Sequence, residues 1–150
     1  MAKSEQAIFT NMCMVTDGDR ILVQDRKKPD WPGICFPGGH VERGESFVAS
    51  VIREVYEETG LTIENPVLCG TKQFQDEGDV RYVVLFYRAD RFHGELKPSD
   101  EGEVFWIKRS DLPKYPLSID MLDMVQVMES ERLSEFYYYQ EDGGWKYKLL

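Results

Sequence analysis

Residues 39–61 read GHVERGESFVASVIREVYEETGL. From residue 46 to residue 59, apolar side chains recur at helical spacing and form a single stripe: Phe47, Val48, Val51, Ile52 and Val55. Ser46 suits the N-cap of such a helix, and Gly60 suits the left-handed position just past its last turn. This stretch therefore predicts a helix over 46–59 that packs one face on a core.

Three carboxylates share one arc of the predicted helix. Glu54, Glu57 and Glu58 stand at i, i+3 and i+4, about a quarter turn from the centre of the apolar stripe. Like charges at these spacings destabilise a helix by about 0.2–0.5 kcal/mol per pair. A divalent cation would reverse that repulsion, because Mg²⁺ prefers oxygen ligands such as carboxylates. The alternative interpretation is an ordinary solvated acidic face.

The residues before the helix favour the metal site. Gly38 and Gly39 form a turn in which the backbone can approach a ligand closely. Counted from Gly39, the segment reads G, five residues, E, seven residues, then R-E-hydrophobic-x-E-E-x-G-hydrophobic. The fixed positions are filled by Gly39, Glu45, Arg53, Glu54, Val55, Glu57, Glu58, Gly60 and Leu61. This pattern resembles the Nudix box without a departure, and nine matches are far more specific than a lone glycine motif.

The resemblance implies both a fold and a chemistry. Nudix proteins have a mixed β-sheet sandwiched between helices, and they hydrolyse a nucleoside diphosphate linked to another group. It implies that Glu54, Glu57 and Glu58 bind Mg²⁺, for which Mn²⁺ can substitute, together with the Gly39 carbonyl. Arg53 would orient a neighbouring glutamate by ion pairing. The catalytic base varies within the family between a helix glutamate and an acid on a distant loop.

Other candidate residues lie outside the box. Glu101 is the first choice for a further metal-binding and catalytic acid and Glu103 the second, because a similar acidic loop precedes a tryptophan in MutT-type members; an acidic surface loop is the alternative. The candidates for substrate binding are Asn11, Arg26, Phe36, Gly38 and Asp120. Asn and Asp can match the donors and acceptors of a purine edge. Asn11 is equally compatible with a place in a strand ladder, Asp120 with a helix cap, and Arg26 with an ordinary surface arginine.

The remaining chain alternates predicted strands with turn signals. We expect strands over 7–15, 20–24, 67–74, 80–89 and 103–108, a loop over 27–33, a second helix over 117–129, and a C-terminal hairpin of 135–140 and 145–149. Strands outnumber helices and are mixed with them, which predicts an α+β fold with a mixed sheet. No linker or repeat interrupts the chain, so residues 1–150 are expected to form one domain.

Composition limits the possible partners. The net charge of −9 disfavours binding to nucleic acid polymers, including RNA substrates for decapping. No apolar run reaches the length of a membrane span, and no signal peptide is evident at the N-terminus. Three unpaired cysteines fit a reducing cytoplasm. We therefore expect a cytoplasmic monomer or homodimer that acts on a small nucleotide.

Across the whole chain, the sequence is similar to bacterial MutT-type members of the 8-oxo-dGTP diphosphatase kind. This similarity implies Mg²⁺-dependent hydrolysis of an oxidised purine nucleoside triphosphate to the monophosphate and pyrophosphate. A hydrolase of ADP-ribose, a dinucleoside polyphosphate or a nucleotide sugar would carry the same box and remains the alternative. A Nudix module that senses nucleotides without cleaving them would be expected to lose box carboxylates, and all are present here.

Overall fold

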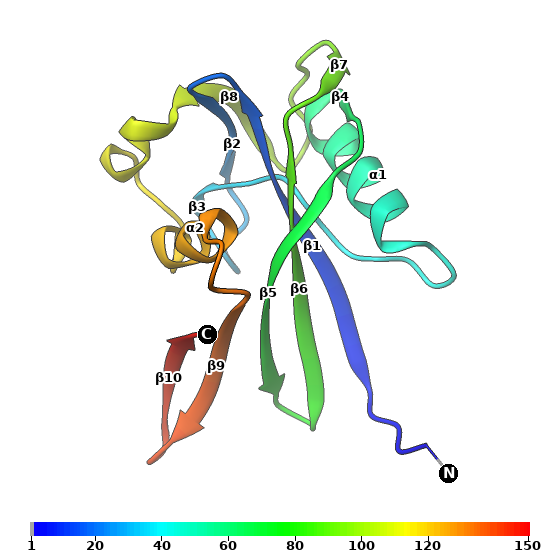
Figure 1. Ribbon diagram of the computed structural model, residues 1–150, viewed down its shortest axis with the longest axis vertical. Helices are drawn as coiled ribbons and strands as arrows, with labels where there is room; N and C mark the ends of the chain where they lie inside the picture. The colour runs from blue at the N-terminus through cyan, green and yellow to red at the C-terminus, as the bar shows by residue number, and fades with distance from the viewer. Residues whose placement is uncertain (1) are drawn as a thin grey trace.

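The computed structural model describes residues 2–150, which form a strongly twisted sheet with a helix on each side (Figure 1). The strands are β1 (Ala7–Asp17), β2 (Arg20–Arg26), β3 (Gly33–Cys35), β4 (Leu61–Ile63), β5 (Val67–Asp76), β6 (Val80–Ala89), β7 (Phe92–Gly94), β8 (Gly102–Lys108), β9 (Glu135–Glu141) and β10 (Gly144–Leu149). The α-helices are α1 (Phe47–Thr59) and α2 (Met121–Glu129), and a 3₁₀ helix covers Arg109–Lys114.

The main sheet is mixed. Its strand order is β10-β9-β5-β6-β1-β2-β3, and β8 also pairs with β2. The pairs β1–β6 and β5–β9 are parallel, while the other pairs are antiparallel. Strands β4 and β7 form a separate two-stranded sheet. The α+β class and the mixed sheet between helices, predicted from the sequence, are therefore confirmed.

Alternation along the central strands creates two cores. Met12 and Met14 on β1 join the cluster that contains the buried face of α2, whereas Cys13 and Val15 join the cluster that contains Val51 of α1. Successive side chains of a strand point to opposite faces of a sheet, so β1 supports both helices at once. Figure 1 shows α1 and α2 on opposite sides of the sheet accordingly.

Most predicted elements are present, with corrections at their ends. Helix α2 begins at Met121, not at residue 117, because Asp120 adopts a left-handed backbone (φ 66°) that no helical turn can include. The predicted stripe of α1 holds for Val51 and Val55, which are fully buried. Its N-terminal part is wrong, since Phe47 and Val48 are 42% and 44% exposed. Phe47 packs instead on the ring of Phe9.

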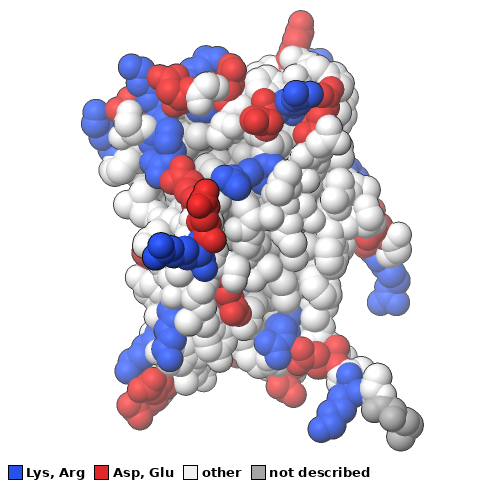
Figure 2. Space-filling model, viewed as in Figure 1, with Lys and Arg blue, Asp and Glu red and all other residues white. Residues whose placement is uncertain are grey.

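Three short strands, β3, β4 and β7, have three residues each and were not predicted. All three cysteines are free, as expected. Within residues 2–150, no helix combines the length and the apolar character needed to cross a bilayer. On the face drawn in Figure 2, basic and acidic side chains of the described residues are intermixed without a continuous basic surface.

Candidate active site

A glycine-containing segment takes the place of a neighbouring strand beside the first half of β1. Strands β1 and β2 pair only next to their connecting turn, at 16–17 and 20–21, and then diverge. The segment 37–41 fills the space between them. The backbone N–H groups of Asn11 and Cys13 donate to the carbonyls of Gly39 (2.8 Å) and Pro37 (2.9 Å). This pairing fixes the turn between β1 and helix α1.

The two glycines of this turn are required by close packing. A Cβ at Gly38 would lie 2.0 Å from the carbonyl oxygen of Asn11, and a Cβ at Gly39 would lie 2.3 Å from the carboxylate of Glu54. A side chain at Gly39 would thus compete with Glu54 for the same space. The turn can lie directly against the carboxylate only because both residues lack a side chain.

Asn11 connects three parts of the site. Its Oδ1 accepts from the Gly39 N–H (3.1 Å), and its Nδ2 donates to the Oγ of Ser50 on α1 (2.9 Å). Asn11 and Ser50 are both buried, and Asn11 is only 4% exposed. Asn11 therefore positions the turn against α1. The sequence suggested that it reads a base, but its amide is already bonded to the protein on both sides.

Glu58 is the most buried carboxylate of α1. It is 5% exposed, and its Oε2 accepts a hydrogen bond from the Gly38 N–H (2.9 Å). Burial raises the pKa of Glu58 to about 8, although the Gly38 N–H opposes the shift. Burial also raises the pKa of Glu54. Both groups are costly to ionise in the absence of a cation, which is a common property of functional carboxylates.

Arg53 organises the acids around the turn. Its guanidinium donates to both oxygens of Glu45 (2.8 and 3.0 Å), to Glu54 (2.9 Å) and to Glu57 (3.2 Å), and it also reaches the carbonyl of His40 (3.0 Å). These bonds hold the pKa of Glu45 low, at about 2. One side chain thus ties α1 to the preceding loop.

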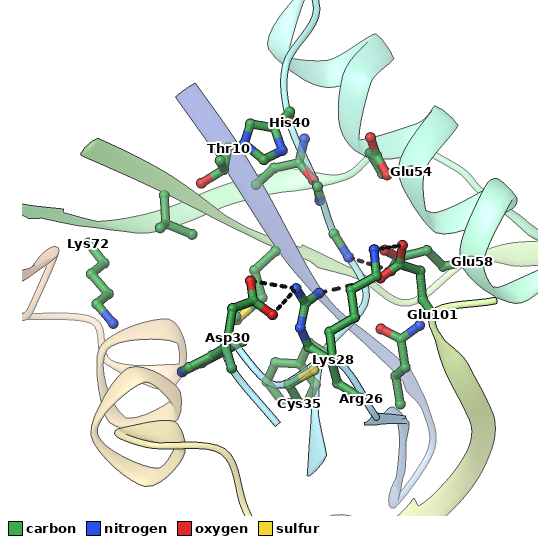
Figure 3. A pocket seen from close by; sticks show the side chains of 18 of the residues that line it. Thr10, Arg26, Lys28, Asp30, Cys35, His40, Glu54, Glu58, Lys72 and Glu101 are labelled. Carbon is green, nitrogen blue, oxygen red and sulfur yellow. Dashed lines mark hydrogen bonds and ion pairs between the residues drawn. The ribbon is translucent and has the colours of Figure 1, made fainter. Parts of the chain in front are cut away.

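The carboxylates open into a cavity of about 650 Å³ (Figure 3). Nine of the residues proposed from the sequence line it: Asn11, Arg26, Phe36, Gly38, Gly39, Glu54, Glu57, Glu58 and Glu101. Arg53 lies behind this wall, and neither Glu103 nor Asp120 is among the lining residues. The structure thus brings together residues that are up to 90 positions apart in the sequence.

Basic side chains surround Glu101. Lys28 Nζ lies 2.6 Å from one of its oxygens and Arg26 Nη1 lies 3.5 Å from the other. Arg26 also bonds Asp30 (3.2 Å). Figure 3 shows Arg26, Lys28 and Glu101 on the same side of the cavity as Glu58. A polyphosphate bound here would meet cationic donors beside the acids.

Part of the opposite wall of the cavity consists of residues that were not predicted from the sequence. Trp31, Lys72, Phe74 and Tyr82 also line the cavity, and the rings of Phe74 and Tyr82 stack with centroids 5.2 Å apart. Residues 72 and 74 on β5, like 82 and 84 on β6, alternate onto one face. This alternation is visible in the sequence, but the sequence does not tell which face borders a cavity.

Asp120 lies just behind this wall. It accepts a hydrogen bond from the hydroxyl of Tyr138, and its carboxylate is 3.9 Å from Lys72 Nζ. Its side chain does not cap α2. Asp120 thus occupies the N-cap position of α2 without a side-chain capping bond, and its carboxylate faces Lys72, which lines the cavity.

The donor set fits a hard cation in its chemistry. Glu54, Glu57, Glu58 and Glu101 supply only carboxylate oxygens, and a cation would offset the cost of ionising Glu54 and Glu58, whose pKa values are raised by burial. Within residues 2–150, no three acidic, histidine or cysteine side chains already form a cluster suited to a metal. Glu54 and Glu57 are bonded to Arg53, whereas Glu58 is bonded to the Gly38 N–H. Metal binding would thus require these carboxylates to converge.

Comparison with known proteins gives one consistent family. A NUDIX domain matches residues 9–128. The chain is 28% identical over 138 residues to an oxidized purine nucleoside triphosphate hydrolase of Danio rerio, covering 86% of this chain and 85% of that protein. It is 34% identical over 116 residues to an ADP-ribose pyrophosphatase of Methanocaldococcus jannaschii, covering 71% and 68%. The crystal structure of a mutator MutT protein from Bacillus halodurans superposes with a TM-score of 0.74 at 32% identity, covering 95% and 97%.

Proposed function

Because this chain belongs to the Nudix hydrolase family, we propose that it hydrolyses oxidised purine nucleoside triphosphates such as 8-oxo-dGTP to the monophosphate and pyrophosphate. As a member of this family, the chain is a hydrolase of pyrophosphate bonds in nucleotide derivatives. Our proposal concerns the specific substrate, which is a nucleoside triphosphate with an oxidised base.

One observation carries this proposal. The cavity has acids and cations on one side, including Glu58, Glu101 and Arg26, and stacked aromatic rings on another, formed by Phe74 and Tyr82. A nucleotide has the same division, with a charged phosphate chain at one end and a flat base at the other. Similarity to an oxidized purine nucleoside triphosphate hydrolase over most of both chains supports the same substrate class.

The residues of the site would have two roles, binding the cation and positioning the groups that bind it. Glu54, Glu57, Glu58 and Glu101, with the Gly39 carbonyl, are the groups that would hold Mg²⁺ or Mn²⁺. When bound, the cation neutralises phosphate charge and makes a water easier to deprotonate. Arg53 bonds both Glu54 and Glu57 and would orient their carboxylates. Asn11 holds the Gly38–Gly39 backbone against α1. Little covalent chemistry is asked of the protein, so positioning and charge stabilisation dominate.

The phosphate and base contacts follow from the same cavity. Arg26 and Lys28 would bind phosphate oxygens once their carboxylate partners turn toward the cation. Phe36, which is 2% exposed and lines the cavity next to the glycine turn, would lie beside the nucleotide. Three free cysteines favour a reducing compartment, and we propose a cytoplasmic enzyme of one Nudix domain, monomeric or homodimeric.

Hydrolysis of ADP-ribose is the second candidate. The specific observation in its favour is the 34% identity to an ADP-ribose pyrophosphatase. ADP-ribose is cleaved to AMP and ribose phosphate and releases no pyrophosphate, so product analysis separates the two reactions.

The test is a panel of 8-oxo-dGTP, dGTP and ADP-ribose with Mg²⁺, each repeated with EDTA. We expect 8-oxo-dGTP to have the highest kcat/KM and to yield pyrophosphate only when Mg²⁺ is present. Hydrolysis of 8-oxo-dGTP no faster than dGTP would overturn the preference for oxidised bases. Dominant cleavage of ADP-ribose would replace this proposal with the second candidate.

A further inference from the structure

Lys72 is a partly buried cation at the far side of the cavity from the acidic helix. Its side chain is 11% exposed, it lines the cavity from β5, and Figure 3 shows it across the cavity from Glu54 and Glu58. Its Nζ lies 5.1 Å and 5.0 Å from the ring centroids of Phe136 and Tyr138. The ammonium therefore sits in an aromatic environment, away from the proposed phosphate site.

The protein leaves the N–H donors of this lysine incompletely used. Its only ion pair in the described chain is with Asp120 at 3.9 Å, which is longer than a hydrogen bond. Contacts with aromatic faces stabilise the charge but accept no directed hydrogen bond of ordinary strength. Burial lowers the pKa of Lys72, and Asp120 opposes the shift. The ammonium therefore has free N–H donors at the cavity wall for an acceptor on a bound ligand.

Asp120 and Tyr138 hold Lys72 in place. The hydroxyl of Tyr138 donates to the Asp120 carboxylate, which fixes that carboxylate behind the cavity wall. Asp120 is not a lining residue, whereas Lys72 is. A ligand in the cavity consequently meets the donor of the pair and not the acceptor.

We propose that Lys72 determines base specificity by donating to a carbonyl oxygen of the base, so that 6-oxo purines are favoured over 6-amino purines. A lysine ammonium has three donors and no acceptor. The O6 oxygen of a guanine-type base accepts from it, whereas the amino group of adenine would present a second donor. Phe74 and Tyr82 are the aromatic residues of the same wall, and they would flank the ring. This inference rests on the proposed function in taking a purine nucleotide as the ligand.

The test compares binding of dIMP and dAMP, which differ at position 6, by calorimetry with Mg²⁺ present. We expect the wild-type protein to bind dIMP more tightly. Lys72→Met keeps most of the aliphatic stem and removes the donors, and it should weaken dIMP binding about 10- to 100-fold while leaving dAMP binding nearly unchanged. Lys146→Met, at an exposed position on β10, is the matched control and should behave as wild type.

Two further variants separate specificity from structural damage. Lys72→Arg retains a cationic donor and should retain the preference for dIMP. Lys72→Gln offers a donor and an acceptor and should bind both nucleotides similarly, which tests the proposal even if Lys72→Met does not fold. An unchanged dIMP-to-dAMP ratio in a folded Lys72→Met or Lys72→Gln protein would show that Lys72 only balances Asp120.

Turnover of 8-oxo-dGTP, dGTP, dITP and dATP distinguishes the two proposals. If wild type releases pyrophosphate from 8-oxo-dGTP faster than from dGTP, but the Lys72 variants keep the wild-type dITP-to-dATP turnover ratio, the proposed function stands and this inference fails. If wild type does not cleave 8-oxo-dGTP while dIMP binding depends on Lys72, this inference stands and the proposed function fails. If wild type binds neither monophosphate, the base-specificity proposal is overturned as well.

Discussion

At the scale of single residues, Glu58 combines deep burial with a carboxylate that is hard to ionise. The raised pKa of about 8 means that the native, metal-free protein keeps a proton that the unfolded chain releases above pH 4.5. A group whose pKa is higher in the folded state binds more protons there, so the free energy of unfolding falls as pH rises. The effect operates between pH 4.5 and about 8.

This property predicts a specific pH dependence of stability. In EDTA, the urea midpoint of the wild-type protein should fall between pH 5 and pH 8 more steeply than that of Glu58→Gln, which has no proton to lose at this position. Added Mg²⁺ should reduce the difference, because the cation replaces the proton. Parallel pH profiles for the two proteins would show that Glu58 ionises normally.

Asn11 carries a second prediction at this scale. Asn11→Ala leaves the Gly39 N–H without its acceptor and removes the donor to Ser50 Oγ, whose hydroxyl still donates to the Phe47 carbonyl. This change should reduce the free energy of unfolding by about 1–3 kcal/mol. It should also lower kcat, because the glycine turn loses its attachment to α1. Gln140→Ala, at an exposed position, is the control and should stay within about 0.5 kcal/mol of wild type. Equal urea midpoints for both variants would contradict the positioning role.

Single residues of the site also differ in how well they can be predicted from the sequence. The acids of the box were identifiable because they lie within one helix and one turn, at fixed spacing. Lys72 and Phe74 were not, because their position depends on how β5 packs beside β6 and α2. Asp120 was identified as a candidate, but only the structure shows that it contacts Lys72 and not the cavity.

At the scale of elements, the two ends of α1 are determined by capping residues that can be recognised in the sequence. The Oγ of Ser46 accepts from the Ala49 N–H (2.9 Å), and Gly60 ends the helix with φ 82°. Ser46→Ala should cost about 0.5–2 kcal/mol of stability while changing kcat little at saturating substrate, because the cap lies a full turn or more from the carboxylates. Chemical denaturation of this variant and of the exposed Ser110→Ala variant measures the difference. A Ser46→Ala protein as stable as the control would show that the Ser46 cap does not stabilise α1.

Elements with strong local signals were predicted and those without were not. Strands β1, β2, β5, β6 and β8 and the β9–β10 hairpin carry alternation or turn residues over several positions. Strands β3, β4 and β7 span three residues each, too few to show a period, and their extended form comes from pairing partners elsewhere in the chain. The start of α2 was misplaced because apolar spacing alone does not reveal the left-handed backbone at Asp120.

At the scale of the whole molecule, charge separates a small nucleotide from a polymer. The net charge is −9, and the face in Figure 2 mixes both signs. Affinity for polynucleotides depends on many Lys and Arg contacts with phosphates. We therefore expect no saturable binding of single-stranded RNA in a fluorescence anisotropy titration at low salt, where such binding would be strongest. Tight, salt-sensitive binding would contradict this prediction and favour an RNA substrate.

The central claim is that the carboxylates of α1 form the catalytic centre of a nucleotide pyrophosphohydrolase. The most direct test measures pyrophosphate release from 8-oxo-dGTP with Mg²⁺ by wild type and Glu58→Gln, with circular dichroism confirming that both are folded. We expect wild type to release pyrophosphate and the monophosphate in equal amounts, and the variant to lose at least about 100-fold in kcat. A folded Glu58→Gln protein with wild-type turnover would contradict it.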